Sequence, residues 1–320
     1  VTGVQTCALP ISLVGGPVRD LLLHRKSHDL DFCSSARPEQ FEPILRRWGH
    51  DGFWDMGRKF GTLGAMRRRA DGTEVKVEVT TYRSDTYDPD SRKPEVNYGD
   101  TLEGDLSRRD FTVNAMALRV PDLEFVDPFG GASDLAKGVL RTPVDPSQSF
   151  DDDPLRMMRA VGFVAQLGFS IAPDAAEAIS SMRDRIEIVS AERVRDELTK
   201  MLLSDRPRAG LEALVESGLA DIVFPEIPAL QLQIDEHHRH KDVFEHTMIV
   251  LERAIALETG PDGPVPAPDL TLRLAAVMHD IGKPKTRRFE PGGKVSFHHH
   301  DAVGAKMTRK RLKADRKSVV

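Results

Sequence analysis

Two aspartates separated by one residue follow a diglycine turn near the start of the chain. The turn is Gly15-Gly16-Pro17-Val18-Arg19-Asp20, and the acidic pair stands in Asp29-Leu30-Asp31-Phe32. Because alternate residues of a β-strand project to the same face, Asp29 and Asp31 are expected to present their carboxylates together. Mg²⁺ prefers such hard oxygen ligands, so the pair is predicted to hold two magnesium ions for phosphoryl transfer. A DxD alone is more often an exposed strand end, but the glycine turn upstream favours the catalytic interpretation.

Three further residue types around this pair suit a nucleotide substrate. Paired glycines after a strand let the backbone approach a phosphate closely, which predicts nucleotide contacts at Gly15 and Gly16. Arg19 stands one turn into the expected helix, within reach of a triphosphate. Glu78 lies in an alternating segment, residues 73–80, that is typical of a strand. Two interpretations stay open for Glu78, a third carboxylate for the metals or an exposed strand charge.

Two later motifs pair arginines with acids. In Arg108-Arg109-Asp110, arginine supplies bidentate phosphate contacts that lysine does not, which favours phosphate binding by Arg109. In Asp152-Asp153-Pro154-Leu155-Arg156, Asp153 and Arg156 share one face if the segment is helical. A carboxylate and a guanidinium together can read the Watson–Crick edge of a base. The alternatives are a solvated charge pair for the first motif and an intrahelical ion pair for the second.

These motifs, in this order, resemble the class II nucleotidyltransferases, which comprise CCA-adding tRNA nucleotidyltransferases and bacterial poly(A) polymerases. The resemblance rests on GGPVRDLLL, DLDF, LSRRDFTVNAMA, DPFGGASDL and DDPLRMMRA, and it covers about residues 13–204. It implies that Asp29 and Asp31 bind the two Mg²⁺ ions and that Glu78 completes the carboxylates. The nucleotide contacts that we expect on this basis are Gly15, Gly16, Arg19, Arg109, Asp110, Asp153, Arg156 and Arg159.

The sequence departs from the family pattern at two positions. Asp152 stands where the family usually has glutamate, and Gly162 stands where an arginine usually precedes Phe163. A glycine inside a helix costs about 1 kcal/mol relative to alanine, and here it also removes one expected contact to phosphate or base. We therefore expect a changed level of activity with the same reaction class. The polar segment 83–105 is predicted to be a long loop, and the resemblance implies that it helps the switch from C to A addition.

A group of histidines and one aspartate in the last third of the chain suits a divalent metal. DVFEHT, MHDIGK and FHHHDAVGAK resemble an HD domain, which some bacterial CCA-adding enzymes carry after their helical body. The resemblance implies a second metal site formed by His246, His279, Asp280 and His300, with phosphohydrolase activity. The distal aspartate of that family is absent before the chain stops, so we expect the HD site to be incomplete.

The amino-acid composition limits the possible fold classes and the possible cellular compartments. The chain has 320 residues, 40% of them hydrophobic, with a formal net charge of −5 and two cysteines outside any CxxC. The length and the hydrophobic content favour several packed domains, and the two cysteines favour a reducing cytoplasm. We expect no membrane span. Because the net charge is negative, a nucleic acid is expected to bind to a local basic surface. We expect an α+β protein: a nucleotidyltransferase head with a mixed sheet, an all-helical neck and body, and a partial helical HD domain. The expected bounds are 1–11 (foreign or disordered), 12–145 (head), 146–233 (neck and body), 234–314 (HD) and 315–320 (foreign).

The sequence thus predicts a CCA tRNA nucleotidyltransferase that joins CMP and AMP, from CTP and ATP, to tRNA 3′ ends without a template. A poly(A) polymerase, or an enzyme limited to A or CC addition, fits the same motifs. A different class is an HD phosphohydrolase with a degenerate head, and a third is an inactive RNA-binding module, which only Gly162 favours. The expected partner is the tRNA 3′ end, gripped through backbone charge and shape; no protein partner is predicted.

Overall fold

The computed structural model describes residues 10–27, 29–88, 91–99, 101–231, 242–260, 265–291 and 295–316, and only the backbone over 84–88, 91–98 and 314–316. The chain divides into two compact units, Val1–Asp152 and Asp153–Val320. Most of the two terminal strings expected to be foreign lies outside the described residues. Ile11 nevertheless pairs with Ser34 and Val120 in the main sheet, and the last helix reaches Arg316.

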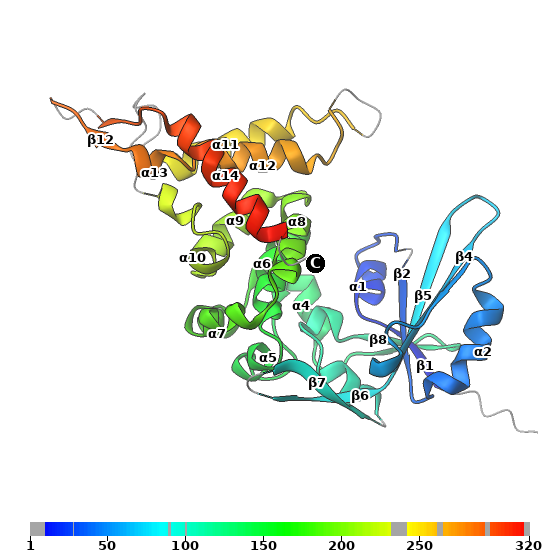
Figure 1. Cartoon of the computed structure of the whole chain (residues 1–320). Helices are drawn as coiled ribbons and strands as arrows, with labels where there is room; N and C mark the ends of the chain where they lie inside the picture. The colour runs from blue at the N-terminus through cyan, green and yellow to red at the C-terminus, as the bar shows by residue number, and fades with distance from the viewer. Residues whose placement is uncertain are drawn as a thin grey trace, which may run out of the picture. The chain divides into compact units, whose positions relative to one another are not determined.

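The first unit is built on a seven-stranded mixed sheet with the order β3-β4-β5-β2-β1-β8-β9 (Figure 1). Strands β2 and β5 pair in parallel, and the other neighbours pair antiparallel. The strands are β1 (Ile11–Val14), β2 (Asp29–Ser34), β3 (Gly52–Trp54), β4 (Thr62–Arg68), β5 (Glu74–Thr81), β8 (Ala117–Val120) and β9 (Glu124–Val126). The mixed sheet confirms the predicted α+β class.

Alternation along the central strands gives the sheet one apolar and one acidic face. Helix α2 (Pro38–Trp48) covers the apolar face, where Phe41 and Leu45 pack in one cluster with Leu63 and Val79. Helix α1 (Gly16–Leu22) lies on the other side of the sheet (Figure 1). The remaining helices of this unit are η1 (Arg58–Phe60), α3 (Leu102–Ser107), η2 (Thr112–Asn114), α4 (Gly131–Lys137) and α5 (Pro146–Asp152).

The segment predicted as a long loop is ordered secondary structure, so that prediction was wrong. Strands β6 (Arg83–Asp88) and β7 (Ser91–Tyr98) form an antiparallel ribbon of their own, and α3 follows them. These two strands pair with each other and not with the seven-stranded sheet, and their sequence lacks the apolar alternation that reveals a packed strand.

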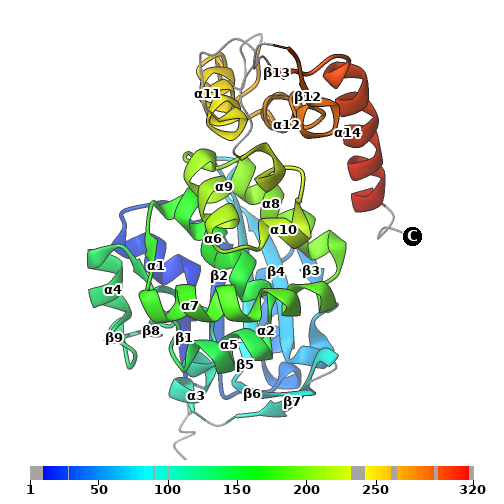
Figure 2. The ribbon, with the colours of Figure 1, turned by 90° about the vertical axis from the view of Figure 1, so that its left-hand side faces the viewer.

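The second unit is helical, as expected from residue 150 onward (Figure 2). Helix α6 packs against α8 and α9, and α11 packs against α12. The helices are α6 (Leu155–Leu167), α7 (Pro173–Met182), η3 (Arg183–Ile188), α8 (Ala191–Leu202), α9 (Pro207–Glu216), α10 (Ala220–Val223), η4 (Pro228–Leu230), α11 (Val243–Ile255), α12 (Leu270–Met278), α13 (Lys283–Thr286) and α14 (His300–Arg316). A short strand pair adds β12 (Arg288–Phe289) with β13 (Val295–Ser296); the two-residue strands β10 (Val139–Leu140) and β11 (Ser170–Ile171) belong to the first and the second unit, respectively. In the described part of the chain, no helix has the length and apolar character needed to cross a membrane.

Candidate functional site

The register between β2 and β5 brings acidic residues from two distant segments together. In this parallel pair Asp31 stands opposite Glu78, and Asp29 stands opposite Lys76. Paired residues in neighbouring strands project to the same face, so Glu78 joins Asp29 and Asp31 on the acidic face of the sheet. The Lys76 ammonium lies 3.9 Å from Oδ1 of Asp29. The three predicted carboxylates therefore form one cluster, with a lysine at its Asp29 end.

The electrostatics of this cluster fit a divalent cation. The pKa of the Asp31 carboxyl is raised, first because surrounding protein displaces water from it and next because the Glu78 carboxylate is close. The Arg109 guanidinium lowers the pKa of Asp31 but does not reverse the shift, and Asp29 raises it further. The Asp31 side chain still reaches solvent, so a ligand has access to it. Crowded carboxylates whose repulsion disfavours ionisation are suited to a cation that relieves the repulsion, and Asp29, Asp31 and Glu78 could hold it.

The diglycine turn and Arg19 are tied to the later RRD motif. Gly15 adopts a φ of 74°, a left-handed conformation that favours glycine, and α1 begins directly after it. Arg19 donates from Nη1 to Oδ1 of Asn114 at 2.8 Å, and Asn114 donates from Nδ2 to Oδ1 of Asp110 at 3.0 Å. Asp110 is buried and also accepts from the Phe111 amide. In this geometry Asp110 acts on Arg19 through Asn114, a residue for which the sequence carried no signal beyond its place in the motif.

Arg109 is held by a second buried acid. Asp105, whose side chain is fully buried, accepts from Arg109 Nη2 at 3.2 Å and also pairs with Arg108. Burial opposes its ionisation, but the two guanidinium groups outweigh burial and lower the pKa of Asp105. A Cβ on Gly15 would lie 2.7 Å from Nη1 of Arg109, so the glycine leaves room for the guanidinium beside the turn. Sequence reasoning missed Asp105, which positions this arginine.

A tryptophan approaches the carboxylates from the edge of the sheet. Trp54 on β3 donates from Nε1 to Oε1 of Glu78 at 3.1 Å. Nothing in the sequence separates Trp54 from an ordinary core tryptophan, because the contact depends on the pairing of three strands.

The predicted base-reading residues belong to the second unit. The expectation that Asp153 and Arg156 share the face of one helix was wrong: Asp151 and Asp152 end α5, and α6 begins at Leu155. A proline disfavours helical backbone in the residue before it, so the chain breaks at Asp153-Pro154. Asp153 therefore precedes the helix, where it accepts from the Leu155 amide at 3.2 Å and from Arg193 Nη2 at 3.1 Å.

Two arginines follow on α6. Arg156 is buried, and Arg159 lies over the ring of Phe163 with its guanidinium carbon 5.4 Å from the ring centre. Gly162 is buried in the same helix, and a Cβ there would meet only Gln166 Nε2 at 3.5 Å and Glu197 Oε2 at 3.8 Å. The position therefore accepts a side chain, and the departure from the family pattern is not forced by crowding.

The HD residues converge from three helices. Nε2 of His279 lies 3.3 Å from Nε2 of His246 and 3.0 Å from Oδ2 of Asp280. One ligand atom from each of these residues lies within 4.8 Å of the others, a spacing that could hold a metal ion. His300, at the start of α14, points Nε2 toward Oδ1 of Asp280 at 3.6 Å. The structure thus brings all four predicted residues together.

Backbone contacts and a lysine shape this cluster further. Nδ1 of His279 contacts the Ala276 carbonyl at 2.7 Å, and Nδ1 of His300 contacts the Phe297 carbonyl at 2.9 Å, which directs both Nε2 atoms toward Asp280. Lys283, buried and missed from the sequence, lies 3.0 Å from Oδ2 of Asp280. Burial opposes ionisation, yet His279 and Lys283 lower the pKa of Asp280 to about 2. Burial also opposes the charge of His279, but its hydrogen bond to Asp280 raises the pKa of that histidine.

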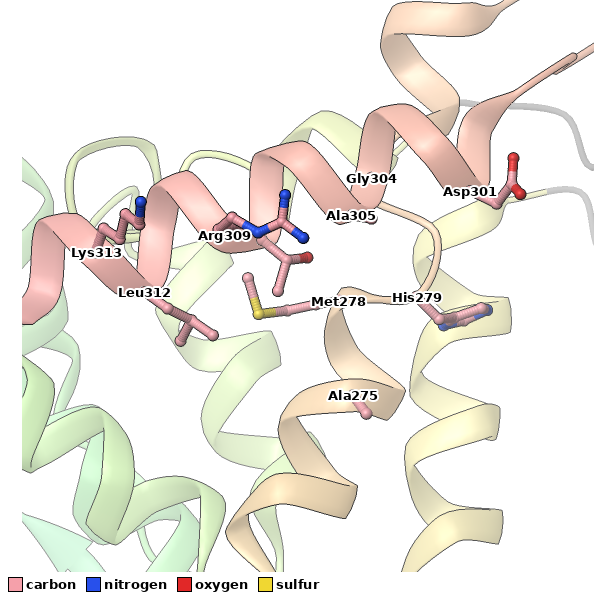
Figure 3. A pocket seen from close by; sticks show the side chains of 10 residues that line it. Ala275, Met278, His279, Asp301, Gly304, Ala305, Arg309, Leu312 and Lys313 are labelled. Carbon is pink, nitrogen blue, oxygen red and sulfur yellow. The ribbon is translucent and has the colours of Figure 1, made fainter.

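A cavity of about 640 Å³ opens beside the HD cluster (Figure 3). His279 and Asp301 lie at one end and Leu312 and Lys313 at the other, with Met278 and Arg309 between them. The cavity therefore joins the histidine to a basic helix surface across an apolar wall.

Three family models match the chain. They are the poly A polymerase head domain over residues 11–141, the probable RNA and SrmB-binding site of polymerase A over residues 168–230, and the HD domain over residues 243–320. A CCA-adding enzyme from Lactobacillus johnsonii is 37% identical over 232 residues, which are 69% of this chain and 56% of that enzyme. The chain therefore spans about half the length of the curated relatives it matches.

Solved structures have the same fold. The Bacillus stearothermophilus CCA-adding enzyme in complex with CTP matches with a TM-score of 0.59 at 26% identity, over 95% of this chain and 78% of that one. A tRNA nucleotidyltransferase complexed with a primer tRNA and an incoming ATP analog matches with a TM-score of 0.61 at 26% identity, over 78% of this chain and 66% of that one.

Proposed function

Because the chain belongs to the nucleotidyltransferase family that shares the poly A polymerase head domain, we propose that it adds CMP and AMP, from CTP and ATP, to tRNA 3′ ends without a template. The observation that carries the proposal is the carboxylate cluster of Asp29, Asp31 and Glu78 beside Arg109 on one face of the sheet. The solved relatives bound to CTP and to tRNA with an ATP analog support this choice of substrates.

The reaction is attack of the RNA 3′ hydroxyl on the α-phosphate of the incoming nucleotide, with pyrophosphate as the leaving group. Asp29, Asp31 and Glu78 hold two Mg²⁺ ions, whose chemistry is to activate the hydroxyl and stabilise the charge on the leaving group. Arg19 and Arg109 bind the triphosphate, and their buried partners Asn114 and Asp105 fix them before the substrate arrives.

The second unit supplies nucleotide selection and RNA binding in this proposal. Asp153, Arg156 and Arg159 distinguish CTP and ATP from other nucleotides through their base edges. Gly15, Gly16 and Asp110 shape the phosphate side of the nucleotide site. We assign residues 12–145 to the head, 146–233 to the neck and body, and 234–314 to the HD part. The two cysteines outside any metal-binding spacing support action in the cytoplasm.

The experiment supplies tRNA that lacks its CCA end with each labelled nucleoside triphosphate in turn. We expect CMP to be joined first, and AMP only after CMP, with magnesium required throughout. Incorporation of AMP alone into any RNA would instead make the protein a poly(A) polymerase or an A-adding enzyme. Incorporation of CMP without later AMP would make it a CC-adding enzyme.

A second candidate function is a metal-dependent phosphohydrolase in the HD part. The convergence of His246, His279 and Asp280 within metal-binding distance favours it, and His300 stands beside them. Release of phosphate from a phosphomonoester that requires Asp280 but not Asp31 would establish this activity. If Asp280→Asn leaves hydrolysis unchanged, the HD cluster is structural.

A further inference from the structure

One indole crosses the sheet to reach a carboxylate of the proposed metal site. Trp54 lies on the edge strand β3, and its Nε1 donates to Oε1 of Glu78 on β5 at 3.1 Å. Strand β4 separates these two strands in the sheet, so the side chain must pass over it (Figure 2). The contact therefore depends on the pairing of three strands, whereas a contact between neighbouring strands depends on the pairing of only two.

A glycine makes this crossing possible. Gly64 on β4 stands opposite Trp54 on one side and opposite Glu78 on the other. A Cβ at Gly64 would lie 2.0 Å from Cε2 of the indole and 2.2 Å from its Nε1. Any side chain there would displace the ring, so Gly64 keeps the path open between the indole and the carboxylate.

The hydrogen bond constrains Glu78 without neutralising it. The indole N–H is a neutral donor, so the contact orients the Glu78 carboxyl group without placing a second charge beside it. Since one oxygen accepts from Trp54, the rotation of the carboxylate is restricted, and the same carboxylate lies close enough to Asp31 to raise the pKa of that residue. Groups that hydrogen-bond a metal-ligating carboxylate orient it, and losing one typically costs 10- to 100-fold in metal affinity or activity.

We propose that Trp54 is a positioning residue for the catalytic metal site, which acts by holding Glu78 toward the cations at Asp29 and Asp31. This rests on the proposed function, because it assumes that the carboxylates bind divalent metal. Glu78 thereby becomes a ligand whose orientation is set by β3, and Gly64 becomes necessary for that orientation.

The chain offers a matched control, because it contains only one other tryptophan. Trp48, at the end of α2, packs against the apolar cluster on the other face of the sheet. Trp54→Phe removes the N–H but keeps a ring, and Trp48→Phe makes the same change without any expected effect on Glu78. In the Trp48→Phe protein, fluorescence comes from Trp54 alone and reports directly on its surroundings.

The first measurement is the Mg²⁺ concentration that gives half-maximal CMP incorporation. We expect Trp54→Phe and Gly64→Ala to raise it roughly 10-fold, with near-normal incorporation at saturating metal, and Trp48→Phe to leave it unchanged. Trp54→Phe and Glu78→Gln should be non-additive, since the indole acts on the metal only through the Glu78 carboxylate, which glutamine lacks. Equal metal requirements in Trp54→Phe and Trp48→Phe, or additive effects of Trp54→Phe and Glu78→Gln, would overturn the proposal.

The second measurement does not depend on activity. Mn²⁺ added to the Trp48→Phe protein should quench Trp54 fluorescence saturably, and Asp31→Asn in that background should weaken the response. Absence of saturable quenching would count against a cation near the indole. If quenching occurs but no nucleotide is incorporated by the otherwise unchanged protein, the proposed function fails while the cation site beside Trp54 stands.

Discussion

The carboxylate site of the first unit and the histidine cluster of the second shift the pKa values of their aspartates in opposite directions. Asp31 has a raised pKa, because removal from water and neighbouring carboxylates disfavour its ionisation. Asp280 is buried, yet its pKa is lowered to about 2, because His279 and Lys283 contribute positive charge. The first site thus leaves negative charge for an added cation, whereas the second already contains the Lys283 ammonium beside Asp280. This difference predicts that the first site depends more strongly on metal.

The largest expected effect is on CMP incorporation, which should require the carboxylate site but not the histidine cluster. Asp31→Asn should lower CMP incorporation roughly 10³-fold or more, because metal catalysis of phosphoryl transfer contributes several kcal/mol to the transition state. Asp280→Asn, a matched change of one aspartate, should leave incorporation within about twofold. The measurement is single-turnover incorporation at saturating nucleotide. Equal losses in the two variants would remove the functional distinction between the sites.

The second expected effect concerns stability without metal, at neutral pH and in a chelator. Asp280→Asn should destabilise the protein by about 2 kcal/mol, since a pKa lowered from 3.8 to about 2 corresponds to that amount of favourable charge interaction. Asp31→Asn should instead be neutral or stabilising, because its ionised form is disfavoured in the folded state. Urea unfolding of both variants tests the contrast. A loss of stability in Asp31→Asn equal to that of Asp280→Asn would contradict it.

The same shifts predict opposite responses to acid. Asp280 has a folded pKa below its unfolded value, so its contribution is present above about pH 3.8 and is lost as the pH falls toward 2. Asp31 has a folded pKa above 3.8, so protonation on acidification relieves its unfavourable charge. The acid dependence of stability should therefore flatten below pH 4 in Asp280→Asn and remain steep in Asp31→Asn. Parallel profiles for the two variants would refute the assigned directions.

The smallest expected effect concerns stability and tests whether packing in α6 requires a glycine at position 162. Gly162→Ala should stabilise the protein by about 1 kcal/mol, because alanine restricts the unfolded chain and a Cβ meets no atom closer than 3.5 Å. Gly210→Ala is the contrasting control, since a Cβ there would lie 2.6 Å from the Met201 side chain and should destabilise. Thermal unfolding measures both changes. A destabilised Gly162→Ala would mean that the glycine is required for packing.

The sequence predicted local elements far better than it predicted pairings. Strand β5 lies within one residue of the alternating segment 73–80 that the sequence predicted, because its apolar repeat is strong. The ribbon of β6 and β7 was missed, since it lies outside the packed sheet and has no such repeat. The end of α5 at Asp152 was missed, because consecutive aspartates followed by proline are typical of the start of a helix.

The residues of the candidate site likewise fall into two groups: those that local motifs predicted and those that only the folded structure revealed. Asp29 and Asp31 could be paired from spacing alone, and the motifs around Arg19 and Arg109 led us to predict phosphate contacts at these two arginines. The buried residues that hold these arginines, Asn114 and Asp105, were invisible as such. Their roles depend on which side chains meet in the folded unit, and that information is not local in the chain.

By itself, the sequence determined that two carboxylates share a strand face, because side chains alternate along any strand with a period of two. It also determined the helical character of the second half and the family to which the motifs point. Only the tertiary structure decided that Glu78 stands opposite Asp31, that Trp54 reaches it across Gly64, and that His246 and His279 meet. These contacts join segments far apart in the chain, and strand register and helix packing, which set them, arise from the fold as a whole.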